Sequence, residues 1–340
     1  MTDYKELKLT ASTSPHIRSK NSARALMLDV IIALLPAWAF SIYNFGLRAL
    51  TVTLVSVLGA VAWEALYRVV MKKPQTVGDL SAVVTGMLIA FVCPVTAPYW
   101  MLLIGDFFAI VIVKQLYGGI GKNFVNPALA ARAFLLSWAS QMSTWAIPGS
   151  RAALFGSTAD VATFATPMSY LHVNDLSGLE AIYDLKRMFI GTIGGSMGET
   201  SALCLLLGLA WLLGRKVISW HIPVSYVGTV AVLTFLFPRG NDAVTWMLYN
   251  LLGGGLMLGA IFMATDYVTS PISKKGRVIY GVGCGLITVF IRYFGSYAEG
   301  VCYSILCMNL CVWLIDKYIK PHRFGVAKKP LFGRKEAAEK

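Results

Sequence analysis

Charged side chains are scarce in this chain. Asp, Glu, Lys and Arg make up 14% of its 340 residues, against about 25% in an ordinary soluble domain. Hydrophobic residues make up 56%, and the mean hydropathy is +0.64. This balance excludes a soluble globular protein and predicts an all-α membrane protein, because each helical span of a bilayer needs about 20 mostly apolar residues.

Acidic residues are scarcer than basic ones. The chain has 17 Asp and Glu against 30 Lys and Arg, a formal net charge of +13. In a soluble protein this excess would favour a nucleic-acid partner. Here the basic residues lie between apolar segments and at the two ends, so we predict no nucleic-acid partner and interpret them as orientation signals. No short apolar run with a cleavage site follows the polar N-terminal residues, so we expect no cleaved signal peptide.

The chain also lacks the usual metal-binding spacings. None of its six cysteines stands in a Cys-x-x-Cys pair. Cys307 and Cys311 are four residues apart on a predicted helix and could share a metal, but small apolar side chains at this spacing more often pack against a neighbouring helix. We therefore expect no iron–sulfur cluster and no metal site.

A phosphate-binding loop is missing as well. The segment 117–132 is rich in Gly and Asn, but Asn123 follows Lys122, where a P-loop needs Ser or Thr. The segment instead predicts a tight turn into a helix, with Asn126 as its N-cap and Pro127 as its first residue. The alternative interpretation is the backbone-lined edge of a ligand pocket.

Ten apolar segments are candidates to cross the bilayer. They are Ala25–Tyr43, Leu47–Val70, Leu80–Cys93, Tyr99–Val113, Asn126–Trp145, Met188–Leu213, Val217–Phe237, Ala243–Ala264, Val278–Phe294 and Val301–Ile319. They divide the chain into an N-terminal arm (1–24), a first group of five spans (25–145), a long polar loop (146–187), a second group of five (188–319) and a basic tail (320–340).

An internal repeat supports this division. Gly86–Pro98 reads GMLIAFVCPVTAP and Gly259–Pro271 reads GAIFMATDYVTSP, with Gly and Pro twelve apart in both and an offset of 173 residues. An odd number of spans per half predicts two inverted five-helix repeats, similar to urea- and ammonium-channel bundles. A solute channel therefore remains an alternative function on this evidence.

The basic residues predict the orientation. With both termini in the cytoplasm, 23 Lys and Arg fall on the inner side and 5 on the outer side. Since Lys and Arg are retained on the cytoplasmic side, we expect a multi-pass protein of a prokaryotic cytoplasmic membrane. The loop 146–187 then lies on the outer face.

That loop contains the stretch DVATFATPMSYL. Asp160, Thr163, Ala165 and Thr166 form the pattern Asp-x-x-Thr-x-Ala-Thr, which resembles the signal that flavin transferases use to attach FMN to a threonine. Thr166 is the expected acceptor, because only a hydroxyl can form a phosphoester and leave the flavin ring free for redox chemistry. The alternative is an Ala-Thr-Pro turn that only closes the loop.

Five acidic residues lie within or at the ends of apolar segments: Asp29, Glu64, Asp106, Glu199 and Asp266. An ionisable group at such a position suggests function, and we take Asp106, Glu199 and Asp29 as candidates for an ion pathway. The alternative is that some of these acids pair with Arg132 or Arg292 and fix the packing of helices.

Several motifs together resemble one family. GGIGKNFVNPALAARAF, the Ala165–Pro167 turn, and GAIFMATDYVTSPISKKGR followed by YGVGCGLITVFIR are similar to the membrane flavoproteins that include the D subunit of the Rnf complex and the B subunit of the sodium-pumping NADH:quinone reductase. The resemblance covers roughly residues 16–320. The short N-terminal arm favours the Rnf type over the quinone reductase type.

The resemblance carries further expectations. It implies covalent FMN on Thr166, a second, non-covalent flavin (riboflavin) in the membrane part, and electron transfer coupled to Na⁺ or H⁺ translocation in a ferredoxin:NAD⁺ oxidoreductase. It also implies partners, namely a second covalent-FMN subunit, two small membrane subunits, cytoplasmic subunits that handle ferredoxin and NAD, and a flavin transferase. No catalytic side chain is expected, since the flavins supply the redox chemistry.

Overall fold

The computed structural model describes residues 22–149, 165–174, 176–240 and 242–320, and it contains helices and no β-strand within these ranges. The first half holds α1 (Ala23–Phe45), α2 (Leu47–Val70), the 3₁₀-helix η2 (Val77–Asp79), α3 (Ser81–Val92), α4 (Tyr99–Phe107), the π-helix η3 (Phe108–Gln115), α5 (Pro127–Leu135) and α6 (Ala139–Met142).

The remaining helices start with three short ones, α7 to α9. They are α7 (Pro167–Val173), α8 (Leu176–Ile182), α9 (Leu185–Ile190), α10 (Ala202–Gly214), α11 (His221–Leu236), α12 (Ala243–Leu252), α13 (Leu256–Leu258), the π-helix η5 (Gly259–Met263), α14 (Lys274–Phe294) and α15 (Val301–Tyr318). The all-α prediction is confirmed.

Four helices of the described chain are long and apolar enough to cross a bilayer: α1, α2, α14 and α15. The pair Ala243–Leu252 and Leu256–Met263 adds a fifth candidate, bent by 61° at the break between them. The other predicted spans are shorter helices or pairs of helices. The count of ten spans therefore stays a prediction.

The structure corrects the fifth predicted segment. A continuous span over Asn126–Trp145 is wrong, because α5 ends at Leu135 and Trp138 has a non-helical backbone (φ −95°, ψ 59°). The Trp138 ring packs edge-on against Phe134 and Trp100, at centroid distances of 5.5 and 6.0 Å. The predicted N-cap is confirmed, since Asn126 Oδ1 accepts from the backbone N–H groups of Ala128 and Leu129.

The sixth predicted segment is also wrong as a single span. Helix α9 ends at Ile190, and residues 191–201 run through the structure without a helix before α10 begins at Ala202. Four glycines and several hydroxyl residues in this segment have low helix propensity. Ser201 then caps α10 by accepting a hydrogen bond from Cys204 N.

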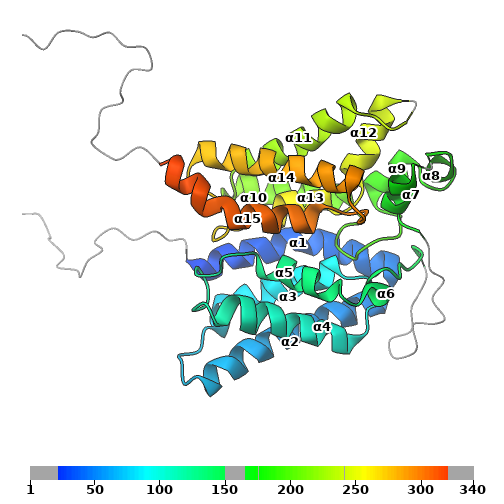
Figure 1. Ribbon diagram of the computed structural model, residues 1–340. Helices are drawn as coiled ribbons and strands as arrows, with labels where there is room; N and C mark the ends of the chain where they lie inside the picture. The colour runs from blue at the N-terminus through cyan, green and yellow to red at the C-terminus, as the bar shows by residue number, and fades with distance from the viewer. Residues whose placement is uncertain (1–21, 150–164, 175, 241, 321–340) are drawn as a thin grey trace, which may run out of the picture.

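The two halves have matching helices. α2, α4 and α5 begin at residues 47, 99 and 127, and α11, α14 and α15 begin at 221, 274 and 301, which gives offsets of 174, 175 and 174 residues. Helices in equivalent positions touch each other across the molecule, α1 against α10 and α5 against α15. Figure 1 shows the first half below and the second half above, with α1 along the boundary.

The three short helices α7, α8 and α9 lie together at one end of the bundle. In Figure 1, α7, α8 and α9 lie at the right, while the start of α1 and the end of α15 lie at the left. These three short helices enclose their own apolar cluster with α12, which contains Met168, Leu171, Leu179, Tyr183, Met188, Ile193, Trp246 and Tyr249. Thr166 therefore lies at the end of the bundle opposite the described ends of the chain.

Candidate functional site

Thr166 is fixed by hydrogen bonds at the start of α7. Its backbone is extended (φ −72°, ψ 157°), Pro167 is the first helical residue, and its Oγ accepts from Ser169 N at 3.3 Å. The Ser169 hydroxyl donates back to the Thr166 carbonyl at 2.7 Å. These contacts hold the hydroxyl that the sequence predicts to be the flavin acceptor.

The residue before Thr166 is fixed by a tyrosine. The Tyr183 hydroxyl donates to the Ala165 carbonyl at 2.7 Å, and the Tyr249 hydroxyl donates to the Tyr183 carbonyl at 2.9 Å. This chain of contacts ties the threonine to α12 of the bundle. Asp160 and Thr163, the other two positions of the predicted motif, lie outside the described residues.

A small cavity of ≈ 20 Å³ adjoins Thr166, lined by Pro167, Met168, the glycine-rich segments 193–195 and 252–254, Glu199, Thr200 and Glu299. The backbone at Gly255 lies close to the Glu199 side chain here. Gly255 has φ +66°, and a Cβ there would lie 2.5 Å from the Glu199 carboxylate. This volume has room for about one water molecule, so neither a phosphate group nor an aromatic ring system fits inside the cavity.

Two glutamates on this cavity share one arginine. Arg132 on α5 donates through Nη1 to Glu199 Oε1 at 2.5 Å and through Nη2 to Glu299 Oε2. Arg132 and Glu199 have side chains that are 9% and 7% exposed. The interpretation of Glu199 as an arginine partner is thus the one that the geometry favours, whereas sequence reasoning missed Glu299, which lies in a loop before α15.

A second buried arginine lies on the other side of the glycine segment. Arg292 on α14 donates to the carbonyl of Asn250 at 2.6 Å and to that of Gly253 at 3.1 Å. The lining of the cavity beside Thr166 contains the two glutamates and no basic residue. Their charge is offset by Arg132, which pairs with both.

The other two candidate acids have different surroundings. Asp29 on α1 receives two hydrogen bonds from Arg215, at 3.2 and 3.4 Å, at the end of α10. Asp106 on α4 is completely buried, and the Ser56 hydroxyl lies 2.8 Å from its carboxyl. The three predicted ion-pathway residues are not brought together. Of the three, Asp106 is the one that forms no ion pair with an arginine of the described chain.

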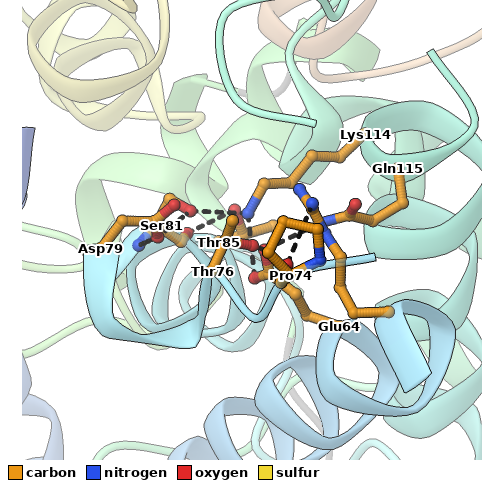
Figure 2. Close-up of polar contacts among 9 residues, drawn as sticks. Glu64, Pro74, Thr76, Asp79, Ser81, Thr85, Lys114 and Gln115 are labelled. Atoms are coloured by element: carbon orange, nitrogen blue, oxygen red, sulfur yellow. Dashed lines mark hydrogen bonds and ion pairs between the residues drawn. The ribbon is translucent and has the colours of Figure 1, made fainter. Parts of the chain in front are cut away.

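A buried polar cluster that the sequence did not predict surrounds Glu64. Figure 2 shows Lys114, Gln115 and Thr76 converging on its carboxylate. Lys114 Nζ lies 3.1 Å from Oε2, while Gln115 Nε2 and Thr76 Oγ1 donate to Oε1 at 2.8 and 2.7 Å. Lys114 Nζ also donates to Ser81 Oγ at 2.6 Å. The predicted apolar segment ends at Val113, but η3 continues through Lys114 to Gln115 and turns both side chains into the protein.

An apolar cavity lies beside this cluster. It has a volume of ≈ 380 Å³ and is bounded by α1, α3, the start of α5 and residues 262–268. Its wall is mostly apolar, with Leu26, Leu88 and Phe262, and it carries a few polar groups, among them Asn123 and Asp266. The volume falls within the range of about 300–1,000 Å³ that is typical of small-molecule and cofactor sites.

Comparison with known proteins adds the family. The family model described as "NQR2, RnfD, RnfE family" matches residues 10–325. A relative from Acetobacterium woodii, the D subunit of a Na⁺-translocating ferredoxin:NAD⁺ oxidoreductase complex, is 48% identical over 95% of this chain and 97% of its own length. The proton-translocating counterpart from Clostridium ljungdahlii is 42% identical over 94% and 97%. The D subunit of an ion-translocating oxidoreductase complex from Stutzerimonas stutzeri is 39% identical over 93% and 96%.

Proposed function

The chain belongs to the NQR2, RnfD, RnfE family, and from this membership we propose that it is the D-type membrane subunit of an ion-translocating ferredoxin:NAD⁺ oxidoreductase. Similarity over nearly the full length of relatives that carry this function supports the proposal. Its partners are then the other subunits of that complex, including a second covalent-FMN subunit, two small membrane subunits and the cytoplasmic ferredoxin- and NAD-handling subunits.

FMN is attached through a phosphoester to Thr166 Oγ in this proposal. The observation that carries it is the threonine hydroxyl fixed at the start of α7, at one end of the bundle. The cavity beside it holds about one water molecule, so the phosphate and the ring system both lie outside it. Once bound, FMN accepts and releases electrons, while the protein holds it at one end of the bundle.

The ≈ 380 Å³ cavity is the proposed place of the second, non-covalent flavin. Its apolar walls fit an aromatic ring, and Asn123 and Asp266 supply polar groups for the polar edge. Lys114 also lies at its wall, where its charge is paired with Glu64. The cavity lies toward the end where α1 begins, since Ala23 is part of its wall, so the two flavin sites belong to opposite ends of the bundle.

The proposed orientation puts Thr166 outside and both termini in the cytoplasm. Most basic residues on the described loops support it, since Lys72, Lys73, Arg215, Lys216, Lys274, Lys275 and Arg277 all lie at or beside helix ends on the terminal side. Electrons would then pass between an outer flavin and an inner one. Among the relatives one is named for Na⁺ and another for protons, so the transported ion is not part of the proposal.

Co-expression with a flavin transferase tests the acceptor. The denatured chain is expected to fluoresce as a flavoprotein band in a gel, and Thr166→Ala is expected to lose the whole signal because no oxygen remains to carry the phosphate. Thr166→Ser, which keeps a hydroxyl at this position, is the matched control. A fluorescent Thr166→Ala band would show that the flavin is attached elsewhere.

A further inference from the structure

Three helices converge on Asp106. A Cβ at Gly59 on α2 would lie 2.8 Å from Asp106 Oδ2, and a Cβ at Gly86 on α3 would lie 2.8 Å from the carbonyl oxygen of Ser56. Both glycines are therefore needed for α2 to approach α4 and α3 this closely. The result is that the carboxyl of Asp106 lies against bare backbone with no exposed surface.

If Asp106 is ionised, the Ser56 hydroxyl faces two acceptors and has only one hydrogen to donate. Ser56 Oγ lies 2.8 Å from Asp106 Oδ1 and 2.9 Å from the Gly86 carbonyl oxygen. A carbonyl and a carboxylate are both acceptors, and a serine hydroxyl has one hydrogen to donate. Satisfying both contacts needs a second hydrogen, and only a protonated Asp106 can provide it.

The charged residues on the surrounding helices are all engaged elsewhere. On α2, Arg48 donates to the Val95 carbonyl, Arg68 donates to the Pro74 carbonyl, and Glu64 is bound by Lys114 of η3. On α5, Arg132 holds Glu199 and Glu299. Helix α3 has no charged residue, and Asp106 is the one on α4.

The second carboxyl oxygen, Asp106 Oδ2, is buried without a hydrogen-bond partner in the described structure. An ionised carboxylate in such a place is strongly destabilising unless it is paired, whereas an acid carbonyl oxygen without a donor is far less so. Burial and hydrogen-bond geometry thus both indicate that Asp106 is protonated.

We propose that Asp106 is a proton-binding site that is occupied at neutral pH, with the acid O–H donating to Ser56 Oγ and the Ser56 O–H donating to the Gly86 carbonyl. No hydrogen bond among the described residues joins Asp106 to Glu64 or Lys114.

Infrared spectroscopy of the purified complex tests the protonation state. The difference spectrum of the parent and Asp106→Asn at neutral pH is expected to contain the C=O stretch of a carboxylic acid, shifted to lower frequency in deuterated water. Loss of carboxylate stretches with no acid C=O band would overturn the proposal. This result does not depend on covalent flavin, so the proton site and the flavin proposal succeed or fail separately.

Ser56→Ala tests the same state without removing the carboxyl. It deletes one hydrogen bond, so the acid C=O band is expected to shift, giving a derivative-shaped feature. Ser304→Ala is the matched control, because the Ser304 hydroxyl is equally buried but is bonded to Tyr226 and Thr288 and to no carboxyl. A shift confined to the carboxylate region in Ser56→Ala would contradict the proposal even if Asp106→Asn fails to assemble.

Discussion

Single side chains from both halves meet beside Thr166. Arg132 comes from α5, Glu199 from the non-helical segment before α10, and Glu299 from the loop before α15. Nη1 of Arg132 binds Glu199 and Nη2 binds Glu299. The arginine therefore joins three segments that are far apart in sequence, and the buried Glu199 and the half-buried Glu299 both depend on it.

Loss of this arginine should be much more harmful than loss of one of its partners. Arg132→Gln leaves two acids without their counter-charge, and breaking a buried pair in this way typically costs about 3–5 kcal/mol. We expect a large fall in the thermal midpoint of the detergent-solubilised protein. Glu299→Gln, the control, keeps the pair with Glu199 and should cost much less. Equal falls in the thermal midpoint of the two variants would mean that the Arg132–Glu199 pair does not contribute to stability.

At the scale of elements, the site beside Thr166 is positioned mainly by places where helices end and non-helical segments begin. Helix α3 stops at Val92, and the segment 191–201 runs past its end, where Gly198 N donates to the Phe91 carbonyl at 3.0 Å and Met197 N donates to that of Cys93 at 3.3 Å. These bonds satisfy carbonyls that the end of a helix leaves free. They also place Glu199 within reach of Arg132.

The close contact at Gly198 can be tested with one methyl group. A Cβ there would overlap with three atoms of the Phe91 side chain, while a Cβ at Gly194 would find its nearest atom at 3.5 Å. Gly198→Ala should destabilise the protein by about 1–3 kcal/mol through overpacking, and Gly194→Ala should have little effect. Thermal unfolding followed by tryptophan fluorescence measures both. A Gly198→Ala variant as stable as the parent would argue against this path of the chain.

At the scale of the whole molecule, the ends differ in charge and in proposed role. The end with α7 to α9 holds Thr166, and the opposite end holds the ≈ 380 Å³ cavity and most of the basic loop residues. Basic loops stay in the cytoplasm. This asymmetry gives the prediction that the two proposed flavin sites face opposite sides of the membrane.

Thiol labelling of intact cells checks the orientation. Lys186→Cys at the start of α9 should react with an impermeant maleimide added outside, and Lys275→Cys at the start of α14 should react only after the membrane is opened. Both side chains are exposed, so access depends on the side of the membrane alone. The parent, with its six native cysteines, gives the background. Labelling in the opposite order would reverse the assignment of the outer face.

The sequence by itself determined the all-α class and the start of α5 at its Asn126–Pro127 cap, while the two related halves stay a prediction that the helix offsets support. These depend on local chemistry, namely apolar length, the Asn126–Pro127 cap and the recurring Gly-Pro spacing. It also predicts Thr166 as the flavin acceptor from a local motif, and this stays a prediction. It misjudged Asn126–Trp145 and Met188–Leu213, since hydropathy alone cannot distinguish a buried non-helical segment from a helix.

Only the tertiary structure decided which buried acids have partners. Asp29, Asp106 and Glu199 look alike in sequence, each a carboxylate among apolar residues. In the fold, Asp29 meets Arg215, Glu199 meets Arg132, and Asp106 meets a serine hydroxyl. The energy of a buried charge depends on what lies within a few ångströms of it, and those neighbours come from helices up to 186 residues away.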